Sequence, residues 1–344
     1  MSCWVWVAPP MKAEAADSPH DGYYYVQVFG NYHDWTDGTG VQVNDWIVTY
    51  KDAAGAEKTT TLSFVQDPKY SNHPNIEGAA LNNIVIAAGW VPGFPTKVHH
   101  DYNVSGCGAD GFGVQPRSLM VGSVANTTSK SGKEVATYGD QYSADSDGGY
   151  DIFNVDTGAH APYADSVTSS AAVEKKSISV PSLGATTNGS ASFTKGGVYD
   201  QYGVRIKDLD GYNLYSDDAA STTAYTPENG VWVNGTTVYA SADAQKGIPN
   251  SSGSQKIYLF GEGSGVKGLL AEITLTYPSY TLTVNPVGSV TASGFNPTII
   301  LNNNSTQTGN WTHTGPYGSA AATYPKGEAT ATGYTFKGFW TVKQ

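Results

Sequence analysis

The feature that most constrains this chain is a series of short runs in which apolar and polar residues alternate, each closed by a turn rich in glycine and aspartate. The first three runs cover residues 23–29, 41–50 and 59–65, and the segments DGTG and KDAAG separate them. Successive side chains of a β-strand point to opposite faces of a sheet, so alternation between turns predicts antiparallel strands. The chain is therefore expected to fold into β-sheets.

The same pattern continues further along the chain. Strands are expected at residues 96–104, 118–124 and 150–155. The composition agrees, because the 23 tyrosines favour strands, the 40 glycines favour tight turns, and long amphipathic helical stretches are lacking. We predict an all-β, multi-domain fold that begins with a β-sandwich.

The length of 344 residues suits two or three domains. Residues 1–19 contain a short apolar run and the small-x-small pattern AEA, and we interpret them as the remnant of a secretory leader. Residues 20–175 are expected to form the β-sandwich, which is the candidate binding domain. A stretch at residues 156–184 is rich in alanine, serine and threonine, and we place the first domain boundary near residues 170–185.

A second series of short strands begins with GGVYDQYGVRIKDLDGYNLYS. The motif VYDQYGV at residues 198–204 and the hairpin-turn pair Asn234-Gly235 resemble bacterial immunoglobulin-like domains. The resemblance implies an Ig-like β-sandwich over residues 176–278. The competing interpretation is an unrelated β-domain with tyrosine-rich strands.

The end of the chain carries the expected strand YTLTVNP at residues 280–286, then the pair Tyr317-Gly318, and finally the aromatic stretch GYTFKGFW at residues 333–340. These features resemble the internalin-type B-repeat, also called the Listeria–Bacteroides repeat. The resemblance implies a small β-grasp-like module over residues 279–344, of a kind found in bacterial surface proteins. We expect the aromatic rings of this stretch to fill the core of the module.

The charge of the chain argues against one large class of partners. The net charge is −11, and Arg117 and Arg205 are the only arginines. A nucleic-acid-binding protein needs a basic face, so we expect no nucleic-acid partner. No run in the sequence approaches the roughly 18 apolar residues of a membrane span. The composition, with only two cysteines, predicts an extracellular protein of a bacterial cell surface.

Two aspartate-rich turns are candidate calcium sites. Asp145, Asp147 and Asp151 lie in DSDGGYD, and Asp208 and Asp210 lie in DLDGYNLYSDD. Calcium prefers about six to eight oxygen ligands on a bent loop. Neither segment matches the EF-hand loop, and such turns are also common without an ion. We expect no cofactor other than this candidate calcium.

Aromatic residues in loops are the better binding candidates. The polar loop NYHDWTDG at residues 31–38 carries Tyr32 and Trp35, whose rings can stack on sugars. Loops at the end of a sandwich commonly carry function. The sequence shows no nucleophile elbow, glycine-rich phosphate loop or zinc-binding helix motif, whereas paired glycosidase carboxylates would leave no signature.

These observations predict a non-enzymatic, modular protein that is secreted or attached to the cell wall and acts as an adhesin. Its first domain would bind a glycan or a surface protein, and the other modules would form a stalk. One alternative is a carbohydrate-binding accessory region of a larger polysaccharide-degrading enzyme. Another is a structural subunit of a surface layer or filament, in which edge strands self-associate between copies.

Overall fold

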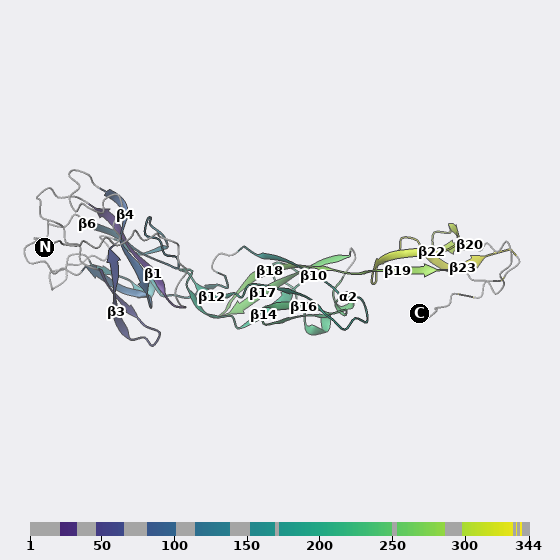
Figure 1. Ribbon diagram of the computed structural model, residues 1–344, viewed down its shortest axis with the longest axis horizontal. Helices are drawn as coiled ribbons and strands as arrows, with labels where there is room; N and C mark the ends of the chain where they lie inside the picture. Colours follow the sequence, from purple (N-terminus) through teal and green to yellow (C-terminus); the bar gives the residue numbers. More distant parts are fainter. Residues whose placement is uncertain are drawn as a thin grey trace, which may run out of the picture. The chain divides into compact units, whose positions relative to one another are not determined.

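The computed structural model describes residues 21–32, 46–64, 81–100, 114–137, 152–168, 172–249, 253–285, 298–332, 335 and 338. The chain divides into two compact units. Unit 1 comprises residues 1–171, 196–210 and 262–268, and unit 2 comprises residues 172–195, 211–261 and 269–344. Strands make up most of the described residues, which confirms the all-β, multi-domain fold (Figure 1).

The helices in the described residues are single short turns. They are α1 (Thr157–His160), the 3-10 helix η2 (Pro227–Asn229) and α2 (Ala244–Gly247). Within the described ranges, no helix has the length and apolar character needed to cross a membrane.

Unit 1 is built on an eight-stranded sheet with the order β7-β6-β1-β4-β3-β2-β5-β8. Each of the six strands predicted in this region coincides with a strand of this sheet, as far as the described residues extend. The strands are β1 (Tyr24–Tyr32), β2 (Trp46–Lys51), β3 (Glu57–Phe64), β4 (Leu81–Val91), β5 (Pro95–His100), β6 (Val114–Gly122), β7 (Lys133–Thr137) and β8 (Ile152–Asn154).

The two halves of this sheet share one hydrophobic core. Val26 of β1 and Leu119 of β6 come from one half, Val48 of β2 and Val98 of β5 come from the other, and all four are fully buried in the same cluster. A single sheet can bring these residues together only by folding on itself. The sandwich predicted for the first domain is therefore present.

The predicted turn KDAAG joins β2 to β3. The carboxylate of Asp52 accepts hydrogen bonds of 2.9 Å from the backbone N–H groups of Ala54 and Ala56. Gly55 adopts a φ of 79°, a left-handed conformation that costs glycine little. Aspartate and glycine thus do here what their turn preferences predict.

A second, three-stranded sheet with the order β13-β12-β9 also belongs to unit 1. The sequence resemblance places residues 198–204 inside an Ig-like domain, whereas the structure groups residues 196–210 with unit 1. Long-range contacts join this segment to unit 1: β12 pairs with β9, and the buried Asp200 bonds to Tyr24 of β1. The strands are β9 (Ala164–Ser166), β12 (Gly197–Asp200) and β13 (Arg205–Asp208).

Unit 2 contains a sandwich of two sheets, with the orders β10-β18-β17-β14 and β11-β16-β15. Its buried residues include Ile178, Leu259 and Ile273 from the first sheet and Val231 and Val238 from the second. The strands are β10 (Glu174–Ser179), β11 (Gly189–Ser192), β14 (Gly211–Tyr215), β15 (Val231–Asn234), β16 (Thr237–Ala240), β17 (Ser254–Gly263) and β18 (Val266–Thr276).

The strand order of this sandwich follows the immunoglobulin pattern. In that pattern, strands B, E and D share one sheet, and strands C, F and G share the other. Assigning B to G in chain order to β11, β14, β15, β16, β17 and β18 reproduces both sheets. In addition, β10 pairs in parallel with β18, the last strand.

The C-terminal part of unit 2 forms two smaller sheets, β19-β22 and β21-β20-β23. Its buried cluster consists of Ile299, Leu301 and Trp311, with partly buried side chains packed against it. Most of the aromatic stretch at residues 333–340 lies outside the described residues, so its predicted core role stays a prediction. The strands are β19 (Ser279–Val284), β20 (Thr298–Leu301), β21 (Thr306–Thr308), β22 (Trp311–Pro316) and β23 (Pro325–Thr330).

Candidate functional site

One end of the unit 1 sandwich is the candidate binding site, because the strand ends that carry its long connections meet there. In the first half of the sheet, Tyr32 at the end of β1 pairs with Leu81 at the start of β4 and with Val114 at the start of β6. In the second half, Trp46 at the start of β2 pairs with Leu62 of β3 and with His100 at the end of β5. We call this the long-loop end.

The connections at this end hold most of the residues predicted from the sequence. Residues 33–45, 65–80, 101–113 and 138–151 each join a strand that ends at the long-loop end to one that begins there. The predicted residues in these connections lie outside the described residues: Trp35, Asp145, Asp147 and Asp151. Tyr32 is the last residue of β1, and the structure describes its strand position but not its side chain.

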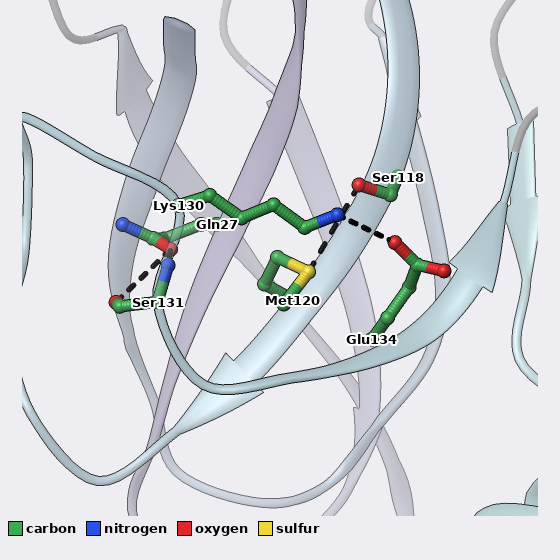
Figure 2. Close-up of polar contacts among 6 residues, drawn as sticks. All are labelled: Gln27, Ser118, Met120, Lys130, Ser131 and Glu134. Carbon is green, nitrogen blue, oxygen red and sulfur yellow. Dashed lines mark hydrogen bonds and ion pairs between the residues drawn. The ribbon is translucent and has the colours of Figure 1, made fainter. Parts of the chain in front are cut away.

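The connections at the opposite end are shorter, and the one from β6 to β7 folds back over the sheet. Its anchor is Gln27, whose side chain is only 1% exposed although it lies in the middle of β1. The Gln27 amide nitrogen donates to the backbone oxygens of Asn126 and Ser129, the latter at 3.0 Å. Its oxygen accepts from Ser131 N at 2.9 Å and Ser131 Oγ at 3.2 Å (Figure 2).

This β6–β7 loop covers an apolar patch on the outer face of β1 and β6. Tyr25, Phe29 and Met120 are buried in one cluster there. Lys130 of the loop lies 5.3 Å from the centre of the Phe29 ring and forms a 2.7 Å ion pair with Glu134, as Figure 2 shows for the ion pair. The β6–β7 loop thus covers the apolar patch, and we assign the loop a structural role in the sandwich rather than a role in binding.

A buried polar cluster ties β12 to the sandwich. Tyr24 Oη donates to Asp200 Oδ2 at 2.8 Å, and Asp200 Oδ1 accepts from the backbone N–H groups of Tyr202 and Val204 at 2.9 Å. Burial raises the pKa of the Asp200 carboxyl. Burial, followed by the charge of Asp200, raises the pKa of Tyr24 strongly and that of Tyr202 to about 12. The three donors that face Asp200 all bond to its carboxylate, and these bonds hold the turn at residues 200–204 in place.

Asp208 and Asp210, the second candidate calcium site, each have a cationic neighbour. Asp208 pairs with Arg205, and Asp210 pairs with Lys207 at 2.7 Å while accepting from Ser264 N at 3.1 Å. The hydrogen bond from Lys207 holds the pKa of Asp210 below its usual value. The described residues contain no group of three or more His, Cys, Asp or Glu side chains that could hold a metal ion. Calcium at this turn would also have to displace the two ion pairs.

The sequence analysis missed a pair of aromatic rings on unit 2. Trp232 of β15 and Tyr239 of β16 stack with their ring centres 5.5 Å apart and their planes 11° apart. The hairpin turn expected at Asn234-Gly235 forms one residue further along the chain, at Gly235 and Thr236. A two-residue turn at Gly235 places Asn234 opposite Thr237, and the same register places the two aromatic residues opposite each other.

Comparison with known proteins adds no family assignment. No protein-family model matches the chain, and no curated protein matches it significantly.

Proposed function

We propose that this protein is a non-enzymatic, modular surface protein, secreted or attached to a bacterial cell wall, that acts as an adhesin. Unit 1 binds a glycan or a surface protein through the long-loop end. The Ig-like sandwich and the C-terminal module form the stalk that presents it. The sequence resemblances to bacterial Ig-like domains and to the internalin-type B-repeat support the stalk.

The observation that carries the proposal is that the strand ends flanking four long connections lie at one end of the sandwich. The strand pairs that position them are fixed by the shared core. Binding residues are found disproportionately on loops held by such a scaffold. Tyr32 lies at the strand end from which the loop carrying Trp35 departs, so both predicted ligand-binding residues belong to this end.

The test is the binding of the full chain to a glycan array and to immobilised host-surface proteins, with the variants Trp35→Ala and Tyr32→Ala. We expect both to weaken binding without lowering the melting temperature. Tyr163→Ala is the matched control, because Tyr163 is 59% exposed and lies outside the long-loop end. Unchanged binding in both variants would remove the long-loop end as the site, and release of sugars from a polysaccharide would contradict the non-enzymatic assignment.

Two alternatives lead to different measurements. A carbohydrate-binding accessory role predicts affinity for plant or microbial polysaccharides rather than for host glycans. A structural role in a surface layer predicts self-association through edge strands. Within the described residues, β7 and β8 each pair on one side only, which leaves the two edges of the sheet of unit 1 for such pairing. Light scattering of the purified chain distinguishes a monomer from ordered assemblies.

A further inference from the structure

The outer face of the sheet β11-β16-β15 in unit 2 carries two aromatic side chains beside uncharged polar ones. Strand pairing aligns Trp232, Tyr239 and Ser190 in one cross-strand row. It aligns Asn234, Thr237 and Ser192 in the next row on the same face. We call these six residues the hairpin face.

The alternation along the strands shows that this face points outward. Val231 and Val238, whose side chains point to the other face, are fully buried. Trp232 and Tyr239 are only partly buried, and Ser190 and Asn234 are exposed. The core of the sandwich therefore lies entirely on the valine side, and the aromatic pair is not needed to fill it.

The stacked pair leaves one side of the indole without a neighbouring strand. Tyr239 lies against one face of the Trp232 ring, at an interplanar angle of 11°. Within the described residues, β15 is the edge strand of its sheet and pairs only with β16. A ligand can therefore approach the Trp232 ring from the edge of the sheet while the tyrosine supports it from behind.

The chemistry of the face indicates what such a ligand would be. The side chains around the two rings carry hydroxyl and amide groups, and none of the six residues is charged. Within the second row, Ser192 Oγ and Thr237 Oγ1 lie 3.2 Å apart, so hydrogen-bonding groups stand beside the rings. A pyranose ring offers C–H groups to an aromatic face and hydroxyls around its rim. An acidic or basic ligand would find no counter-charge among these six side chains.

We propose that the hairpin face is a second binding site, independent of the long-loop end, that takes an uncharged saccharide stacked on Trp232 and Tyr239. Unit 2 then contributes to adhesion itself instead of serving only as a spacer. Asn234, Thr237 and the two serines supply hydrogen bonds to the sugar hydroxyls.

The test uses the full chain in affinity electrophoresis and calorimetry with named probes. The neutral probes are laminarin, xylan, mannan and hydroxyethyl cellulose, and the acidic probe is polygalacturonate. We expect at least one neutral polysaccharide to bind, and Trp232→Ala or Tyr239→Ala to weaken this binding by about tenfold or more, the scale of one lost stacking contact. Tyr239→Phe keeps the ring and should keep the binding.

Tyr324→Ala is the matched control, because Tyr324 is an aromatic residue that is 52% exposed and lies outside the hairpin face. The folded fraction of each variant is checked by circular dichroism, so that a lost site is distinguished from a lost fold. If Trp232→Ala fails to fold, Tyr239→Ala and Tyr239→Phe still separate binding from stability. The proposal is overturned if no neutral probe binds, if polygalacturonate binds equally well, or if folded Tyr239→Ala binds like the wild type.

Discussion

The hydroxyl of Tyr24 donates a 2.8 Å hydrogen bond to the carboxylate of Asp200, a residue 176 positions later in the chain. Both side chains are buried, at 5% and 2% exposure. This contact links the first strand of unit 1 to a turn that returns to the same unit after part of unit 2 has been traversed. The bond is one of the contacts that join residues 196–210 to unit 1, together with the pairing of β12 with β9.

Tyr24→Phe should destabilise unit 1. The change keeps the ring, which packs edge-on against Phe94 at 5.4 Å, but it leaves Asp200 Oδ2 without its donor. A buried acceptor that loses its partner costs about 1–3 kcal/mol. Urea unfolding measures the loss. Tyr163→Phe, at an exposed tyrosine, serves as control and should cost less than about 0.5 kcal/mol. Equal effects of the two changes would contradict the role of this bond.

The stability of unit 1 should depend on pH through Asp200. Burial raises the pKa of its carboxyl above the ordinary value of 3.8, so the folded state favours the protonated form. The stabilisation that comes from this preference is complete below the pKa of the carboxyl in the unfolded chain. It is lost as the pH rises through the pKa of the carboxyl in the folded chain. Melting curves from about pH 3 to pH 8 should show a wild-type advantage over Asp200→Asn that shrinks as the pH rises. A constant difference across this range would contradict the assignment.

Gln27→Met should release the β6–β7 loop from the sheet. The substitution keeps the length of the side chain but removes the amide that bonds to Asn126, Ser129 and Ser131. The unpaired backbone groups should cost about 1–3 kcal/mol. Hydrogen exchange at the Ser131 amide measures the release. The control, Lys130→Ala, removes an exposed ion pair worth about 0–1 kcal/mol and the contact with the Phe29 ring, but it keeps the bonds from Gln27 to the loop backbone. If the Ser131 amide stays protected in Gln27→Met, Gln27 is not the anchor.

Variants in the two aspartate-rich segments can show which of them binds calcium. Asp208 and Asp210 are already paired with Arg205 and Lys207, so we expect Asp210→Asn to leave any effect of chelators unchanged. A double Asp145→Asn/Asp147→Asn variant should abolish that effect if calcium binds at that segment, because an ion that binds only the folded state stabilises it. Melting with and without a chelator is the measurement. A chelator effect that disappears in Asp210→Asn would place the ion at the second segment instead.

Local patterns in the sequence predicted the elements of this fold well. The turn at Asp52 and Gly55 follows from the conformational preferences of these residues, and so does the hairpin whose loop begins at Gly235, which has a φ of 58°. In such cases the interactions that form the element lie within a few residues of each other. The register that brings Trp232 opposite Tyr239 does not follow from an Asn234-Gly235 loop, which would place Trp232 opposite Thr237. In the structure the two loop residues are Gly235 and Thr236.

Local patterns in the sequence did not predict the contacts between residues that lie far apart in the chain. Alternation along β1 places Gln27 on the same face as Tyr25 and Phe29, which suggests a solvent-facing position for this polar residue. The structure buries it instead, because a loop about a hundred residues later supplies its partners. The pairing of Asp200 with Tyr24 is equally invisible to a local pattern. Strand periodicity likewise predicts where the strands of the long-loop end stop, but it does not specify how the connections that follow them are arranged.

Trp311→Ala should unfold the C-terminal module while leaving unit 1 intact. Trp311 is 5% exposed and packs with Ile299 and Leu301, which are the buried residues of its cluster. Removing so large a core side chain costs about 3–5 kcal/mol, a large part of the stability expected for a module of this size. Phe336→Ala should have a similar effect if the aromatic stretch fills the same core, as the sequence predicts.

The measurement is segment-resolved hydrogen exchange of the wild type, Trp311→Ala and the exposed control Tyr324→Ala. Amides of β19, β20 and β22 should lose protection in Trp311→Ala, whereas those of β1 and β6 keep theirs, because separate compact units unfold separately. Binding through the long-loop end should survive the change, since that site belongs to unit 1. Loss of binding with β1 and β6 still protected would show that the C-terminal module contacts the ligand, and the division into binder and stalk would then be wrong.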